Sequence, residues 1–262
     1  MWSKQRILDD LRELRINPGD SVIVHASLRA VGKVDGGADA VIEALLETVG
    51  PEGTIVVPTF SHGRKTSENA SIPAADSVAT DILGILPERL ARHPYARRSS
   101  HRALSFTAVG KNAEFLTSNA PFHFPLGANS PLARLYQLNG GILLLGVGHE
   151  ASSAIHLAEI WADVPYGRRQ AVVLNEKEEW QEMLGSPECS RGFRKIEPVL
   201  RHARILREGY VGNAASQYMR IQFAVSMAVE MLKGNPESLL CDDPACEACT
   251  HARRFTAEQR PL

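Results

Sequence analysis

The sequence predicts an α/β fold, a central mixed β-sheet flanked by helices, in one domain that spans residues 1–262. Two observations support this fold class. Residues 21–57 hold a short apolar run, a glycine pair, a helix-like segment and a second apolar run, which is the order of a βαβ unit. A further apolar run at 142–145 is bounded by glycines and is typical of a fully buried strand.

The rest of the chain alternates between helix-like and strand-like patterns. Residues 3–15 carry aliphatic side chains at helical spacing, which predicts an amphipathic helix. Gly36-Gly37 opens the helix of the βαβ unit, and Gly50-Pro51 ends it. Strands are expected at 21–24, 54–57, 104–109, 142–145, 171–174 and 205–211. Helices are expected at 3–15, 36–49, 80–91, 111–119, around 156, at 193–203 and at 213–232.

Three segments show neither the helical nor the strand periodicity of apolar residues. Residues 60–79 are polar and long for a plain connection, so they predict a functional loop or lid. Residues 121–131 are rich in proline and predict a rigid loop, and residues 175–192 are charged and irregular.

The composition narrows the functional class. A net charge of -1 provides no overall field that would attract nucleic acid or an anionic membrane. No apolar run approaches the roughly 20 residues that a membrane-spanning helix needs. The N-terminus lacks the apolar core of a signal peptide, and the four cysteines are too unevenly spaced for a disulfide framework. We therefore expect a cytoplasmic protein of enzyme size with no nucleic-acid or membrane partner.

The segment 140–159, GGILLLGVGHEASSAIHLAE, is the most informative part of the chain. His156 and Glu159 lie three residues apart and share one face if the segment is helical. A histidine placed just beyond a buried strand is suited to general-base work, because its ordinary pKa lies near neutrality. A histidine that only packs under a loop, beside a solvated glutamate, explains this segment alone equally well.

The end of the first strand holds a second candidate site. His25, Ser27 and the Gly36-Gly37 pair lie where ligands bind in open α/β sheets. Neither a dinucleotide fingerprint nor a P-loop is present, so glycines that merely form a turn remain the simpler interpretation. Other histidines in or beside loops are more typical of hydrogen-bonded structural residues: His62, His101, His123 and His149.

Cysteines gather near the C-terminus, in the segment CDDPACEACTH at 241–251. Zinc accepts three thiolates and an imidazole tetrahedrally, so Cys241, Cys246, Cys249 and His251 are candidate ligands of a structural zinc in a small tail element. Reduced free thiols are the alternative. Cys189 stands apart, without a recognisable motif, and is expected to be a buried inert thiol.

Three segments together resemble the aminoglycoside 3-N-acetyltransferase family, also called the antibiotic N-acetyltransferase family. They are 22–60 (VIVHASLRAVGKVDGGADAVIEALLETVGPEGTIVVPTF), 98–116 (RSSHRALSFTAVGKNAEFL) and 123–159 (HFPLGANSPLARLYQLNGGILLLGVGHEASSAIHLAE). The resemblance implies transfer of an acetyl group from acetyl-coenzyme A to an amine, by direct transfer in a ternary complex. Arg102 replaces the proline usual after the family's histidine at His101, and Ser152-Ser153-Ala154-Ile155 departs from the usual Asn-Thr-Ser-Leu.

The resemblance also implies roles for single residues. His156 matches the family's histidine and is the expected base, with Glu159 beside it. Glu182 is nominated to orient the imidazole, and His25 to assist. The expected coenzyme wall consists of His25, Ala26, Ser27, Leu28, Val34, Gly36 and Gly37, with Ser105 along the pantetheine arm. Backbone N–H groups near Ser27 or Ser105 are expected to bind the thioester oxygen, and the irregular loops 60–79 and 175–192 to form the acceptor pocket.

Several alternatives stay open at this point. The acceptor is an aminoglycoside or a non-antibiotic amine. A non-catalytic coenzyme-binding protein would bind the coenzyme without turnover, and a metal-dependent hydrolase would use the histidines and terminal cysteines. A homodimer is a further expectation.

Overall fold

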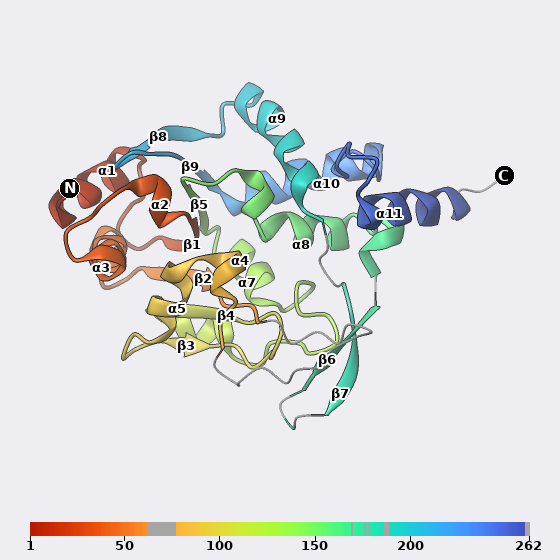
Figure 1. The fold of residues 1–262 in the computed structure, drawn as a ribbon, viewed down its shortest axis with the longest axis horizontal. Coiled ribbons are helices and arrows are strands. Elements are labelled where there is room, and N and C mark those ends of the chain that lie inside the picture. Colours follow the sequence, from red (N-terminus) through yellow and green to blue (C-terminus); the bar gives the residue numbers. More distant parts are fainter. Residues whose placement is uncertain (62–76, 169, 176, 178, 186–188, 260–262) are drawn as a thin grey trace.

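The computed structural model describes residues 1–61 and 77–259, except 169, 176, 178 and 186–188. The predicted α/β fold is confirmed, with a seven-stranded sheet at its centre and a two-stranded ribbon beside it (Figure 1). The strands are β1 (Ser21–Ala26), β2 (Thr54–Pro58), β3 (Arg97–Arg98), β4 (Phe106–Gly110), β5 (Gly141–Leu145), β6 (Gln170–Leu174), β7 (Trp180–Leu184), β8 (Arg207–Val211) and β9 (Ala214–Arg220). The order in the large sheet is β3-β4-β2-β1-β5-β9-β8.

The sheet is mixed, as the sequence predicts. Strand β1 pairs in parallel with β2 and with β5, while β4 and β9 extend the sheet antiparallel on either side. The parallel pair β1–β2 is joined through a helix at 37–49, so the βαβ unit is confirmed. The three parallel strands are buried almost throughout, which is why they read as apolar runs.

Helices cover both faces of the sheet. Their bounds are α1 (Lys4–Glu13), α2 (Leu28–Val31), α3 (Gly37–Val49), α4 (Thr80–Leu83), α5 (Ile85–Ala91), α6 (Ala113–Thr117), α7 (Pro131–Gln137), α8 (Ala154–Trp161), α9 (Glu197–His202), α10 (Ile221–Gly234) and α11 (Glu247–Glu258). Three short 3₁₀ helices are η1 (His149–Ala151), η2 (Pro165–Arg168) and η3 (Arg191–Ile196).

Side-chain alternation along the strands divides the interior into two hydrophobic clusters. Val22 and Val24 of β1 face the cluster that α1, α3 and α5 complete. Ile23 faces the other side of the sheet, where α6, α7, α8 and α10 supply the apolar side chains. Both clusters therefore pack on the same sheet, one on each face. The assignment of the chain to a single domain stays a prediction.

Two predicted segments are wrong. Residues 214–220 form strand β9 and not the start of a long helix, which begins only at Ile221. The two residues Gly212-Asn213 close a hairpin with β8, and pairing with β5 outweighs the helix propensity of the alanines. The segment 175–192 is not irregular throughout, because β7 pairs with β6 in the ribbon that extends from one corner of the molecule (Figure 1).

Smaller differences occur at helix ends. Gly84, with φ of +78°, divides the predicted helix at 80–91 into α4 and α5. The predicted helix at 193–203 is part 3₁₀ helix η3 and part α9. Helices α7 and α11 were not anticipated. Among the described residues, no helix combines the length and the apolar character that crossing a membrane requires.

Candidate active site

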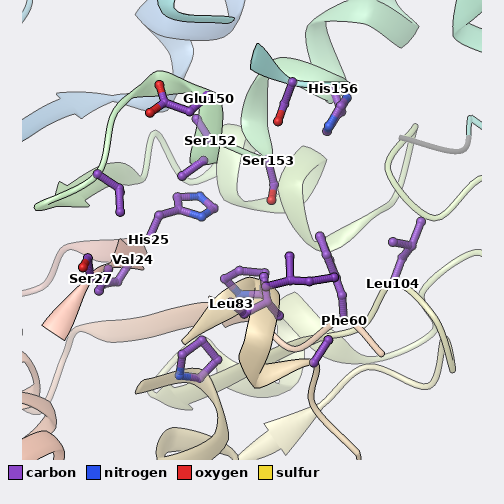
Figure 2. Close-up of a pocket in the computed structure, with 18 of the residues that line it drawn as sticks. Val24, His25, Ser27, Phe60, Leu83, Leu104, Glu150, Ser152, Ser153 and His156 are labelled. Atoms are coloured by element: carbon purple, nitrogen blue, oxygen red, sulfur yellow. The ribbon is translucent and has the colours of Figure 1, made fainter. Parts of the chain in front are cut away.

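A cavity of about 840 Å³ lies at the carboxyl ends of β1, β2 and β5, the edge at which open α/β sheets bind ligands. Residues 24–27 of β1 and its exit line one side, and residues 150–153 with His156 line another. Phe60, Leu83 and Leu104 form a mostly apolar wall (Figure 2). A volume of this size is suited to a small-molecule ligand or two adjoining ones.

His156 stands in the first half of α8, with its ring against this cavity. The residue is only 9% exposed, and Nδ1 lies 2.7 Å from Oε2 of Glu159, one helical turn further on. A carboxylate accepts only, so Nδ1 donates and the Nε2 lone pair is left to accept a proton. The ring of Phe193 meets the imidazole edge to face, with centroids 4.8 Å apart, and fixes its orientation.

His25, on β1, is the second histidine in the cavity wall (Figure 2). It is 5% exposed, and its buried Nε2 has no hydrogen-bond partner among the described residues. Burial lowers the pKa of His25 to about 4, because the apolar surroundings penalise the imidazolium. His25 is therefore neutral near pH 7 and can offer a ring nitrogen to a ligand.

The carboxylate at the imidazole is Glu159 and not Glu182. Glu182 lies on β7 with an exposed side chain, and its backbone carbonyl contacts Nδ1 of His123 at 3.0 Å. The nomination of Glu182 places it in a 175–192 segment that is expected to be irregular. The ribbon pairs with itself instead.

Only some of the residues that are expected to form the coenzyme wall line the cavity. His25, Ala26 and Ser27 line the cavity. The lining does not include Leu28, Val34, Gly36 or Gly37, which belong to α2 and to the entry of α3. Gly36 and Gly37 are exposed and have φ of +79° and +61°, so the tight turn before α3 itself requires glycine. A coenzyme diphosphate at this turn stays a prediction.

Ser105 is not among the residues that line the cavity. It is 1% exposed, donates to the Thr59 carbonyl oxygen at 2.7 Å and accepts from Nε of Arg98 at 2.8 Å. The neighbouring residue Leu104 lines the cavity instead. The backbone N–H of Ser27 donates to Leu145 at 2.8 Å. The oxyanion donors expected near Ser27 therefore do not include its own N–H.

The predicted lid at 60–79 lies mostly outside the described residues, as does His62. Its described ends, Phe60, Ser61 and Ala79, line the cavity. Arg98 holds these ends together, because its guanidinium donates to the carbonyls of Thr59 and Ser77 at 2.7 and 2.9 Å. His101 and His123 are hydrogen-bonded structural residues, as expected.

The predicted metal set needs a correction. The sulfur atoms of Cys189, Cys241, Cys246 and Cys249 all lie within 4.8 Å of one another, while His251 is exposed on α11. Cys189 is therefore neither isolated nor a plain buried thiol. The segment after the ribbon returns to the C-terminal tail, and this non-local contact leaves no signal in sequence spacing.

Two further site residues escaped sequence reasoning. Phe193 packs on His156 from 3₁₀ helix η3, and its aromatic character alone could not distinguish it from other core residues. Glu150 is an exposed carboxylate that lines the cavity just beyond β5 (Figure 2). Its position in a GHE sequence after a buried strand was the available signal.

Comparison with known proteins identifies relatives of this chain. The sequence model of the family described as aminoglycoside 3-N-acetyltransferase matches residues 23–233. Aminoglycoside N(3)-acetyltransferase IV from Salmonella sp is 34% identical over 240 residues, which cover 90% of this chain and 89% of that protein.

Solved structures with the same fold include ligand complexes. The aminoglycoside acetyltransferase AAC(3)-IVa apoenzyme is 34% identical, with a TM-score of 0.86 and 97% of each chain covered. A histidine-to-alanine mutant of that enzyme, in complex with a gentamicin, gives a TM-score of 0.85 at 34% identity over 97% of each chain. The binary complex of AAC-IIIb with CoASH is 26% identical, with a TM-score of 0.77, over 88% of this chain and 96% of that one.

The family pattern runs from β1 to the end of α10, and a named member shares a third of its residues over nine tenths of this sequence. The chain therefore belongs to the aminoglycoside 3-N-acetyltransferase family.

Proposed function

We propose that this protein transfers the acetyl group of acetyl-coenzyme A to an amine of an aminoglycoside. The observation that carries the proposal is the His156–Glu159 pair, which presents a proton acceptor to the cavity at the carboxyl edge of the sheet. The relatives' complexes with CoASH and with a gentamicin support both substrates.

The transfer needs one base and no covalent enzyme intermediate. The neutral amine nitrogen attacks the thioester carbonyl carbon, and Nε2 of His156 takes the proton that this nitrogen loses as the C–N bond forms. Glu159 stabilises the resulting imidazolium through Nδ1. The tetrahedral intermediate then expels the coenzyme sulfur, which receives the proton from His156 and leaves as the free thiol.

His25 is the candidate donor to the thioester oxygen. A neutral imidazole donates an N–H to a developing oxyanion without carrying a charge of its own. Its buried, unpartnered Nε2 and lowered pKa support this role over that of a second base.

Glu150 supports a cationic acceptor. Aminoglycosides are polycations, and this exposed carboxylate lines the cavity. A non-antibiotic amine would use the same catalytic residues and differ only in this outer part of the site. A homodimer and a cytoplasmic location stay predictions.

A coenzyme-thiol release assay with a panel of acceptors tests the proposal. Gentamicin and apramycin represent aminoglycosides, and simple mono- and diamines represent other acceptors. We expect release with an aminoglycoside at a kcat/KM well above that for the simple amines. Thiol release with the simple amines alone would show that the acceptor is a simple amine and not an aminoglycoside. Coenzyme binding without thiol release for any acceptor would contradict the assignment of the protein as an enzyme.

A further inference from the structure

The cysteine cluster joins two parts of the chain that are far apart in sequence. Cys189 follows the β6–β7 ribbon, whereas Cys241, Cys246 and Cys249 come from the tail that leads into α11. All four are free thiols. Disulfides would pair the sulfurs two by two at about 2.05 Å, but here each sulfur lies near all three others.

We propose that Cys189, Cys241, Cys246 and Cys249 bind one structural zinc ion that braces the wall of the active-site cavity. Zinc–sulfur bonds of about 2.3 Å in a tetrahedron place sulfurs about 3.8 Å apart, which agrees with mutual distances under 4.8 Å. The two-residue spacing between Cys246 and Cys249, at the start of a helix, is common in structural zinc sites. Four protein ligands leave no open position, so this site is structural and not catalytic.

The surroundings suit a tetrathiolate zinc, which carries a net charge of -2. Arg191, two residues after Cys189, donates to Asp243 at 2.8 Å and lines a small cavity together with Cys241, so its positive charge lies beside the cluster. The backbone N–H of Cys241 donates to the sulfur of Cys249 at 3.4 Å. Donors around the ligands offset the thiolate charge and fix the sulfur positions.

The two segments also approach each other at backbone distance beside the cluster. A Cβ atom on Gly192 would overlap the Leu239 carbonyl oxygen and lie 2.7 Å from the Cys241 nitrogen. Arg253 and Lys195 add hydrogen bonds to the carbonyls of Cys241 and Leu240, at 2.6 and 2.7 Å. The tail is therefore fastened to η3 from several sides, with the cysteines at the centre.

The contacts between the tail and η3 are connected to the cavity and to His156 through two residues. Ser190, next to Cys189, lines the cavity, and Phe193, in the same 3₁₀ helix as Gly192, packs against His156. The cysteines are positioning residues in this account, since they act on His156 through η3. The metal site does not depend on which amine is the acceptor.

Metal analysis of the whole protein is the first test. The chain is purified without a metal-binding tag or chelator, and its zinc content is measured for wild type, Cys189→Ser and His251→Ala. We expect one zinc per chain in wild type and in His251→Ala, and its loss in Cys189→Ser. Zinc retained by Cys189→Ser but lost from His251→Ala, or no zinc in wild type, would overturn the proposal.

A measurement on wild type alone covers the case in which Cys189→Ser fails to fold. Zinc is exchanged for Co²⁺, whose visible absorption reports the ligand set. We expect the intense thiolate-to-cobalt and tetrahedral bands of a four-sulfur site. Absence of these bands, with four titratable thiols or with disulfides in the metal-free protein, would overturn the assignment.

Amide hydrogen exchange tests whether zinc stabilises the wall of the active-site cavity. Zinc removal should speed amide exchange in residues 190–196 and 239–249 and leave α3, across the sheet, unchanged; added zinc should restore protection. Equal exchange in η3 with and without zinc would reject the link to the cavity wall, even where zinc binds. These readouts do not require turnover, so their failure is distinct from failure of the acetyl transfer.

Discussion

At the scale of single residues, the proposed mechanism gives the two ring nitrogens of His156 different roles. Nδ1 is held by Glu159 at 2.7 Å, and Nε2 is left to take the proton. Glu159→Gln keeps the size of the side chain but removes its charge and lets an amide N–H group face Nδ1, which favours the wrong tautomer. We expect kcat to fall about 100-fold or more with little change in either KM, measured by steady-state kinetics.

The matched control is Glu13→Gln, an exposed glutamate on α1. Both variants should melt close to wild type, which separates loss of chemistry from loss of structure. A kcat of Glu159→Gln equal to that of the control would show that the carboxylate does not position the base.

The buried His25 makes the free energy of unfolding depend on pH. Its pKa is about 4 in the folded protein, because of burial, against an ordinary value of 6.5. Between these values the unfolded chain binds the proton and the folded one does not, so stability falls as pH drops from 6.5 toward 4. A shift of this size corresponds to about 3 kcal/mol across the window. Urea unfolding at several pH values should show a shallower dependence in His25→Gln than in wild type.

His202→Gln is the control substitution, because His202 is exposed and does not line the cavity. If wild type and His25→Gln lose stability in parallel between pH 6.5 and 4, His25 is not held neutral by burial.

Sequence reasoning brought His156 and Glu159 together because they are neighbours on one helix. His156 and Glu159 needed only helical periodicity to be placed together. Glu182 and Ser105 do not line the cavity, because their positions depend on contacts with distant segments that one sequence does not reveal. The roles expected of them stay predictions. Cys189 was missed as a partner of the tail cysteines for a related reason, the return of a distant segment.

At the scale of elements, the contact between η3 and the tail depends on a glycine. Gly192→Ala would place a methyl group against the backbone of Leu239 and Cys241, which cannot move as a side chain can. We expect a loss of about 1–3 kcal/mol in the free energy of unfolding, the usual range for overpacking. Gly234→Ala, where nothing lies within 4 Å of the added carbon, should be nearly neutral. Equal stability of the two variants would contradict the close backbone approach.

Element prediction succeeded where periodicity and tertiary context agree. The strands at 21–26, 54–58 and 141–145 read as apolar runs because parallel strands are buried on both faces. Residues 214–220 are predicted to be helical because two alanines begin an apolar stretch. In the structure this segment pairs with β5 and forms strand β9. The Gly212-Asn213 turn was the missed local signal for that hairpin.

At the scale of the whole molecule, a net charge of -1 provides little long-range attraction for a polycation. Recognition of a cationic acceptor then depends on local groups such as Glu150 at the cavity. Because this carboxylate is exposed, an ion pair to it is worth about 0.2–1 kcal/mol, so Glu150→Gln should raise the aminoglycoside KM about 1.5- to 5-fold.

The acetyl-coenzyme A KM should not change in Glu150→Gln, and added salt should narrow the difference from wild type. An unchanged aminoglycoside KM at low salt would place acceptor recognition elsewhere in the cavity.

The account as a whole depends on His156 as the base, and comparison of wild type with His156→Ala tests it most directly. Coenzyme-thiol release with one aminoglycoside gives kcat, and calorimetry gives the coenzyme affinity of both proteins. We predict a kcat about 100- to 10,000-fold lower in the variant, with nearly unchanged coenzyme affinity. Turnover that survives the substitution nearly intact would contradict the assignment of His156 and with it the proposed mechanism.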